Sequence, residues 1–206
     1  MTAQRIGVMG GTFDPIHLGH LTAAATIADR LRLDTVIFVP AGEPWHRGRQ
    51  PVAGREQRFE MTCRAVAGDP RFVASRADID RPGPTFTIDT LTDLKQARKE
   101  SGGQATGDDA WFFITGADAL AGFMSWRQPL GILGLAHLVG VTRPGHALIA
   151  PALPPGTCTL IETPGIDVSS TEVRDRIRDG LEVTGLVPAS VADYVADHGL
   201  YARQPS

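Results

Sequence analysis

Short apolar runs rich in β-branched residues alternate along this chain with longer stretches in which apolar residues recur at helical spacing. The short runs predict strands at residues 5–8, 35–40, 72–74, 110–115, 136–142 and 157–162. The intervals between them favour helices, and residues 18–31 in particular carry the small and apolar side chains of a helix that packs on a sheet. This alternation predicts an α/β fold in which helices flank a parallel sheet.

The same pattern predicts where a ligand would bind. In a parallel sheet the site lies at the carboxyl ends of the strands, where Gly10, Pro40, Gly116, Arg143 and Ser169 are expected to converge. A chain of 206 residues can bury the core of one substantial domain, and helical periodicity in its last part ends at Gly199. We therefore expect a single Rossmann-like domain over residues 1–206, with 168–206 as its C-terminal helical segment.

One segment between the first predicted strand and the first predicted helix is suited to bind an anion. It reads GGTFDPIHLGH, residues 10–20, and its glycines expose backbone N–H groups beside the positive end of a helix. It is not a P-loop, because Thr12 and Phe13 follow the glycines where a P-loop requires Lys and then Ser or Thr. It is not a dinucleotide fingerprint, because Gly7, Gly10 and Gly11 do not fit the spacing G-x-G-x-x-G. Asp14, directly before Pro15, is expected only to hold its own turn.

The histidine pair His17 and His20 distinguishes this segment. Three positions apart at the start of a helix, the two imidazoles are expected on one face, and Gly19 leaves room for a ligand between them. Imidazole N–H groups suit phosphate oxygens. A chance pair and a zinc site are the alternatives, and zinc is disfavoured because the chain has no Cys-x-x-Cys or His-Glu-x-x-His spacing.

A second anion-binding helix start is predicted in the segment VSSTEVR, residues 168–174. Ser169 and Glu172 fit a capping box at the start of an amphipathic helix. The groups that could meet an anion there are the hydroxyls of Ser170 and Thr171, the unpaired backbone donors and the guanidinium of Arg174. Helix capping alone is the alternative role of these hydroxyls.

Composition excludes several classes of partner. With 20 basic and 23 acidic residues and a net charge of −3, the chain has no Lys/Arg-rich stretch for a nucleic acid. No apolar run approaches the roughly 20 residues that span a bilayer, and the first residues lack a secretion-signal pattern. The isolated Cys63 and Cys158 fit a reducing compartment. We therefore expect a cytoplasmic protein without a nucleic-acid or membrane partner.

The two motifs together resemble the two signatures of the nucleotidyltransferase superfamily. Its members join a nucleoside triphosphate to a phosphate-bearing acceptor and release pyrophosphate, and in that family the two segments face each other across the triphosphate. From the first strand to HGLY at 198–201, the chain resembles bacterial nicotinate-mononucleotide adenylyltransferases. The segments between that carry this resemblance are PWHR at 44–47, TFTIDTL at 85–91, ITGAD at 114–118, Trp126 and TRPG at 142–145. Trp45 and Arg127 depart from the family pattern, which leaves the shape of the acceptor pocket in doubt.

The resemblance implies adenylyl transfer from ATP to nicotinate mononucleotide, giving deamido-NAD and pyrophosphate by in-line attack without a covalent intermediate. It assigns catalysis to His17, His20 and Arg174. It assigns ATP binding to Gly10, Gly11, Thr12, Phe13, His17, Gly19, His20, His46, Arg47, Ser169, Ser170, Thr171 and Arg174. It assigns the acceptor to Phe86, Thr87, Gly116, Asp118, Trp126 and Arg143. Mg²⁺ is expected to bind mainly through the ATP phosphates, with no metal ligand supplied by the protein.

Alternatives stay open at this point. His46 and Arg47 could belong to an ordinary solvated loop, Asp118 could be a helix N-cap instead of a ribose partner, and Trp126 could be a core residue instead of a stacking platform. A sister transferase that uses nicotinamide mononucleotide or phosphopantetheine would differ only in the acceptor pocket. A non-catalytic nucleotide sensor would lack a phosphate-site residue, and none is missing. ATP and nicotinate mononucleotide are the expected partners, and homo-oligomerisation is left open.

Overall fold

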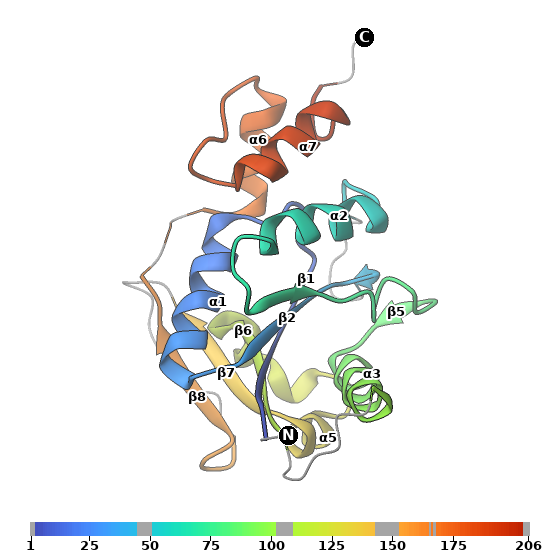
Figure 1. Ribbon diagram of the computed structural model, residues 1–206, viewed down its shortest axis with the longest axis vertical. Coiled ribbons are helices and arrows are strands. Elements are labelled where there is room, and N and C mark those ends of the chain that lie inside the picture. The colour runs from blue at the N-terminus through green and yellow to red at the C-terminus, as the bar shows by residue number, and fades with distance from the viewer. Residues whose placement is uncertain are drawn as a thin grey trace.

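The architecture is a parallel sheet with helices on both faces (Figure 1). The computed structural model describes residues 3–44, 51–101, 109–142, 153–164, 166 and 168–203. In this part of the chain one six-stranded sheet has the order β4-β2-β1-β6-β7-β8, and every neighbouring pair is parallel. Its strands are β1 (Arg5–Gly11), β2 (Thr35–Pro40), β4 (Phe72–Ala74), β6 (Ala110–Gly116), β7 (His137–Thr142) and β8 (Cys158–Glu162). The predicted α/β class and all six predicted strands are confirmed.

Helices fill most of the intervals between these strands. They are α1 (Leu18–Leu31), α2 (Arg55–Val66), α3 (Thr87–Glu100), α4 (Ala117–Ala121), the 3₁₀ turn η1 (Phe123–Ser125), α5 (Pro129–Leu135), α6 (Ser170–Arg178) and α7 (Ala189–Asp197). A second sheet pairs β3 (Glu43–Pro44) with β5 (Pro84–Thr85). The sequence pattern did not predict this small sheet, because two-residue strands carry no periodicity. None of the described helices is both long and apolar enough to cross a bilayer.

Alternate residues of the central strands fill two separate cores. Met9, Phe38, Ile114 and Val139 pack with α1, α2, α6 and α7 on one face of the sheet. Their neighbours Val8, Val39, Phe113 and Leu138 pack with α3, α4, η1 and α5 on the other. Successive side chains of a strand point to opposite faces, so a sheet covered on both faces needs apolar residues at nearly every position. That requirement explains why the strands read as continuous apolar runs.

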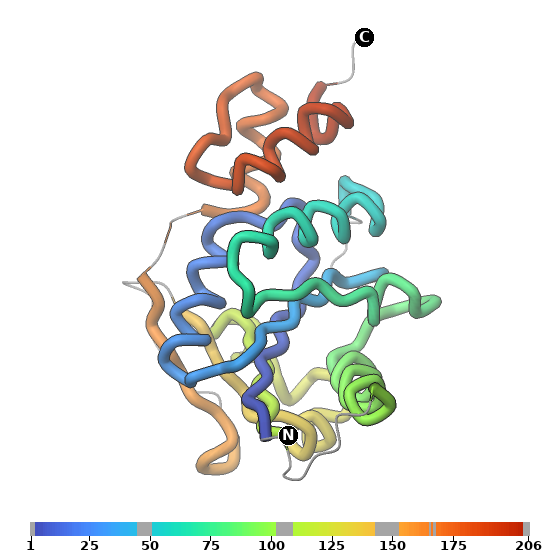
Figure 2. Tube along the Cα trace, in the orientation of Figure 1, coloured from blue at the N-terminus to red at the C-terminus, as the bar shows by residue number. Residues whose placement is uncertain are grey.

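The C-terminal helices α6 and α7 lie at the end of the sheet where β1 finishes (Figure 2). The Leu18 N–H at the start of α1 donates to the Leu186 carbonyl between α6 and α7, at 2.8 Å. The Ser190 hydroxyl of α7 donates to the Arg64 carbonyl of α2 at 3.2 Å, and the Arg64 guanidinium lies 4.9 Å over the Tyr194 ring. The first and last parts of the chain therefore meet beside the carboxyl ends of the strands.

Candidate active site

A cleft of about 1390 Å³ opens at the carboxyl ends of β1, β6 and β7. Thirteen residues predicted to bind nucleotide or acceptor line it: Gly10, Gly11, Thr12, Phe13, His17, Gly19, His20, Gly116, Asp118, Ser169, Ser170, Thr171 and Arg174. Phe86, Thr87 and Trp126 are not among its lining residues. His46, Arg47 and Arg143, and the unusual Trp45, lie outside the described residues. The structure thus brings the two sequence motifs into one cleft.

The two histidines of the first motif form a stacked pair at the start of α1. His17 is the N-cap, His20 is the third helical residue, and their ring centroids lie 3.7 Å apart at an interplanar angle of 25°. The prediction that they share a face is confirmed. The His17 N–H donates to Nδ1 of His20 at 3.3 Å, so the neutral His20 ring carries its proton on Nε2. That nitrogen is then a hydrogen-bond donor for an anion.

Two glycines of the first motif lie so close to neighbouring side chains that an added Cβ would push these side chains away. A Cβ on Gly19 would lie 3.0 Å from Nδ1 of His17 and 3.1 Å from Cγ1 of Val168, so α6 could not approach the histidine pair as closely. A Cβ on Gly11 would lie 2.6 Å from the ring of Phe13. Phe13 has a φ of 49° and packs its buried ring against the edge of His20, at a centroid distance of 5.0 Å. The lack of a side chain at these two positions therefore leaves the space that the His17 and Phe13 rings occupy.

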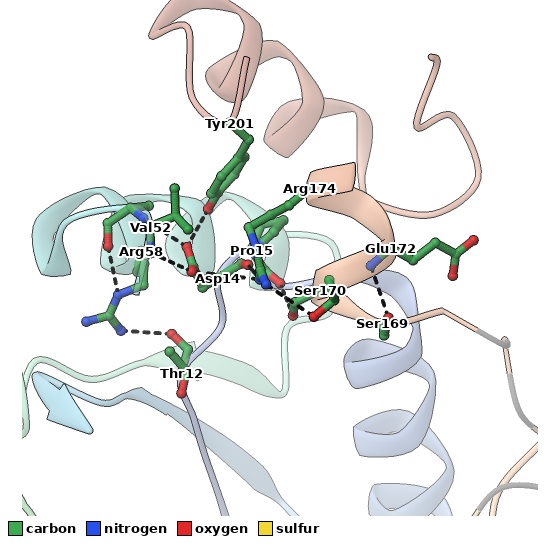
Figure 3. Close-up of polar contacts among 12 residues, drawn as sticks. Thr12, Asp14, Pro15, Val52, Arg58, Ser169, Ser170, Glu172, Arg174 and Tyr201 are labelled. Carbon is green, nitrogen blue, oxygen red and sulfur yellow. Dashed lines mark hydrogen bonds and ion pairs between the residues drawn. The ribbon is translucent and has the colours of Figure 1, made fainter. Parts of the chain in front are cut away.

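The second motif docks onto the first (Figure 3). Ser169 is the N-cap of α6, and its hydroxyl accepts a hydrogen bond from the Glu172 N–H at 3.1 Å, as the capping pattern predicted. The Ser170 hydroxyl donates to the Pro15 carbonyl at 2.9 Å. Arg174 donates through Nη1 to the Asp14 carbonyl at 2.6 Å and through Nη2 to the Thr171 hydroxyl at 3.1 Å. Here both hydroxyls predicted to meet phosphate have partners within the protein.

The expectation that Asp14 holds only its own turn is wrong. Its carboxylate accepts hydrogen bonds from the Val52 and Ala53 N–H groups, at 2.8 and 3.1 Å, and from the Tyr201 hydroxyl at 2.8 Å. These donors lie 38, 39 and 187 residues away in the sequence. Asp14 is only 5% exposed, so burial of its charge requires several strong donors. Figure 3 shows the side chain between Val52, Tyr201 and Arg174.

Arg58 of α2 is a buried cation that the sequence did not reveal. It is 1% exposed and donates to three carbonyls: Thr12 at 2.8 Å, Gly42 at 2.9 Å and Ala53 at 3.3 Å. Burial lowers the pKa of Arg58, and the nearby Asp14 charge acts in the opposite direction. Nothing in the local pattern marked this arginine, because its partners come from other segments. Its hydrogen bonds connect Thr12 of the first motif with Gly42, which follows β2, and with Ala53, which precedes α2.

Three of the residues expected to bind the acceptor, Phe86, Thr87 and Trp126, lie around the start of α3 and before α5. Phe86 is the N-cap of α3, Thr87 is the first helical residue, and the Arg127 guanidinium lies 4.7 Å over the Phe86 ring. Trp126 is half-buried, with ring centroids 6.0 Å from Phe113 and 5.3 Å from Phe123. These contacts show that Trp126 packs partly on the core, and they leave part of its surface exposed.

The structure excludes one of the two predicted roles of Asp118, that of a helix N-cap. The N-cap of α4 is Gly116, so Asp118 is not the N-cap but lies within the first turn of that helix. Its side chain is exposed and lines the cleft. A carboxylate in this position can accept a hydrogen bond from a ligand hydroxyl.

Comparisons with known proteins agree with this geometry. Residues 8–176 match the model of the cytidylyltransferase-like family. The chain is 53% identical over 200 residues to the "Probable nicotinate-nucleotide adenylyltransferase" of Acidothermus cellulolyticus, covering 97% of this chain and 95% of the relative. It is 50% identical over 197 residues to the protein of the same name from Leifsonia xyli, covering 96% and 94%.

Among solved structures, the chain is similar to the Plasmodium falciparum nicotinic acid mononucleotide adenylyltransferase complexed with NaAD. The TM-score is 0.71 at 17% identity, covering 96% of this chain and 97% of the other. A second structure of the same Plasmodium falciparum enzyme, complexed with APC, gives a TM-score of 0.70 at 16% identity, covering 96% and 97%. At such low identity the likeness concerns the fold.

Proposed function

Since the chain belongs to the cytidylyltransferase-like family and, within it, to the nicotinate-nucleotide adenylyltransferases, we propose that it transfers the adenylyl group of ATP to nicotinate mononucleotide. The products are deamido-NAD and pyrophosphate, which is a step of NAD biosynthesis. The observation that carries the proposal is the meeting of the two motifs in one cleft. The stacked His17 and His20 lie on α1, and the N-terminus of α6 with Arg174 lies beside them.

The chemistry needs charge stabilisation more than acid–base catalysis. The attacking phosphate monoester has a second pKa of roughly 6, so at neutral pH it is already mostly a dianion and needs no general base. The obstacle is the approach of two polyanions and the charge that develops on the leaving pyrophosphate. His20 offers an Nε2 donor at the transferred phosphoryl group, and His17 stacks against it. Arg174 and the unpaired N–H groups that begin α6 would hold the leaving end.

The contacts of the Ser169, Ser170 and Thr171 hydroxyls change the roles that we propose for them. The Ser170 and Thr171 hydroxyls contact the Pro15 carbonyl and Arg174, so their contribution to phosphate binding would be through the orientation of α6 and of the arginine. The Ser169 hydroxyl accepts from the Glu172 N–H, so the N–H groups of Ser170 and Thr171 are the ones that would meet the triphosphate. The proposal therefore assigns direct contact with the triphosphate to the helix backbone and Arg174 and not to the hydroxyls.

Mg²⁺ would enter this site with ATP. We expect the phosphate oxygens to supply most of its ligands, because Mg²⁺ commonly binds through substrate phosphates. The described residues contain no group of three or more His, Cys, Asp or Glu side chains that could hold a metal ion. Bound there, the ion would neutralise charge on the β- and γ-phosphates.

The two cysteines, Cys63 and Cys158, are free thiols, and we propose that the enzyme works in a reducing cytoplasm.

The test is pyrophosphate release with ATP and Mg²⁺, compared for nicotinate mononucleotide, nicotinamide mononucleotide and phosphopantetheine. We expect a strong preference for nicotinate mononucleotide. Pyrophosphate release with only one of the other two acceptors would support the assigned phosphate site and contradict nicotinate mononucleotide as the acceptor. If the protein binds ATP but releases no pyrophosphate with any of the three acceptors, the result would contradict the proposed activity and favour a non-catalytic nucleotide sensor.

A further inference from the structure

We propose that Asp14 and Tyr201 are positioning residues for adenylyl transfer: the Tyr201 hydroxyl fixes the Asp14 carboxylate, and Asp14 in turn holds Arg174 in the orientation that binds the triphosphate. The inference rests on the proposed function, because it concerns the same cleft. It assigns a role in the reaction to Tyr201, on the turn after α7, a residue of the HGLY segment for which the sequence predicted no role.

The first step is the dependence of Arg174 on Asp14. Nη1 of Arg174 donates to the Asp14 carbonyl at 2.6 Å and lies 3.8 Å from Oδ2 of its carboxylate. Nη2 donates to the Thr171 hydroxyl at 3.1 Å. A long arginine side chain loses rotamer entropy when it is fixed, and these contacts fix it before the substrate arrives. Since a guanidinium has five N–H donors, others are left for an anion in the cleft that Arg174 lines.

The second step is the rigidity of Asp14 itself. Oδ2 accepts from the Val52 N–H, and Oδ1 accepts from both the Ala53 N–H and the Tyr201 hydroxyl. With donors on both oxygens, the carboxylate cannot rotate without breaking several bonds at once. Its backbone is fixed with it, and that backbone supplies the carbonyl that Arg174 binds. The position of Arg174 therefore depends on groups that do not touch it.

The third step is the role of the Tyr201 hydroxyl as a hydrogen-bond donor to the Asp14 carboxylate. Burial raises the pKa of Tyr201, and the Asp14 charge raises it further, so the phenol keeps its proton across the physiological range. The residue has a φ of 65° on the turn that ends α7, where the Leu200 N–H donates to the Val195 carbonyl at 3.0 Å. Figure 3 shows the Tyr201 hydroxyl directed at the buried Asp14 carboxylate. A side chain that only filled space would not need this hydroxyl.

A purely structural role is the competing explanation, in which Tyr201 simply attaches the C-terminal turn to the fold. The two explanations differ in one respect. A structural attachment lowers stability, and its effect on activity would be the same whatever residue stands at position 174. A positioning role requires Arg174, so the effect of removing the Tyr201 hydroxyl should disappear when the arginine can no longer make its planar contacts.

The experiment is a double-mutant cycle on the full chain, with Tyr201→Phe, Arg174→Lys and the double variant. Lysine keeps the charge and lacks the guanidinium fork. We expect Tyr201→Phe to lower kcat/KM for ATP about 5-fold in the natural background, a loss of the size of one ordinary hydrogen bond, and less than about 1.5-fold beside Arg174→Lys. The KM for nicotinate mononucleotide should change less than about 2-fold in both.

Tyr194→Phe is the matched control, since Tyr194 lies on α7 and is the other tyrosine of the chain. It should retain full activity. All assays are run below the lowest melting temperature of the set, so that unfolding does not contribute. Equal losses from Tyr201→Phe in both backgrounds, or no loss in either, would overturn the inference while the unsubstituted enzyme still releases pyrophosphate. Absence of pyrophosphate release from the unsubstituted enzyme would overturn the proposed function instead.

Discussion

The two sides of this molecule that are assigned to the two substrates are built by different forces. Around Asp14 and Arg58, buried charges are held by directional hydrogen bonds from segments far apart in the chain. Around Phe86 and Trp126, aromatic rings pack on one another and on the second core. Hydrogen bonds fail abruptly when one partner is removed, whereas apolar packing adjusts. The phosphate side should therefore respond sharply to single substitutions and the aromatic side gradually.

The largest effect should come from removing the buried cation of the phosphate side. Arg58→Met would leave three buried carbonyls without their donor, so we expect the free energy of unfolding to fall by about 3 to 5 kcal/mol. Urea denaturation measures this. Arg55→Met is the control on the same helix, where the side chain is exposed and the expected loss is below about 0.5 kcal/mol. Losses of similar size at both positions would mean that the buried network contributes little.

The next effect concerns catalysis on the same side. His20→Ala should reduce kcat by roughly 10² or more with the fold intact, the size typical of losing one positioned electrostatic donor. The measurement is pyrophosphate release under saturating substrates, with circular dichroism to verify folding. His198→Ala removes an exposed imidazole at the end of α7 and should leave turnover unchanged. Normal turnover in a folded His20→Ala variant would show that the stacked pair only supports the helix.

A smaller effect should appear on the aromatic side. Trp126→Ala is expected to raise the KM for nicotinate mononucleotide about 10-fold and the KM for ATP less than about 2-fold, since one base-sized ring stacked on an aromatic side chain gains roughly 1 to 3 kcal/mol. Steady-state kinetics with each substrate varied in turn separates the two values. If both KM values rise together and the melting temperature falls, Trp126 acts as a core residue through its contacts with Phe113 and Phe123.

The smallest effect is a change in pH dependence near the start of α3. Asp78 is buried and accepts hydrogen bonds from Thr90 at 2.7 Å and Arg81 at 2.8 Å, yet burial raises its pKa above the ordinary value of 3.8. The folded state therefore binds the proton more tightly than the unfolded state does. This stabilisation is complete below about pH 4 and is lost as the pH rises through the folded pKa. Asp78→Asn should remove that slope from urea denaturation at pH 4, 5 and 6, and an unchanged slope would contradict it.

Local patterns predicted most of the scaffold. The bounds of α1 and of β2 agree with the expected ranges because helical spacing and β-branched runs are properties of neighbouring residues. The shared face of His17 and His20 followed from their separation by three positions, and the stacking of their rings is seen only in the structure. The two-residue strands β3 and β5 were missed because they are shorter than any period.

What could not be predicted depends on partners distant in the sequence. Arg58 lies in a helix that reads as ordinary and polar, and one of its carbonyl partners is 46 residues away. The donors to Asp14 come from as far as 187 residues along the chain, so the residues around it gave no sign of its role. Whether Trp126 meets a ligand depends on how α3 and α5 pack. Each of these is decided by tertiary structure and leaves no trace in local spacing.

The bond between Asp14 and Tyr201 also has a consequence in time. A ribosome that adds roughly 5 to 20 residues per second makes Asp14 about 10 to 40 s before Tyr201, the residue 187 positions later. During that interval the nascent chain can pair its early strands and form the histidine turn, but the carboxylate beside it lacks its last donor. A polypeptide whose synthesis stops short of Tyr201 would present a nearly complete nucleotide cleft with its arginine poorly held. The carboxylate therefore gains its last donor only after synthesis has passed Tyr201.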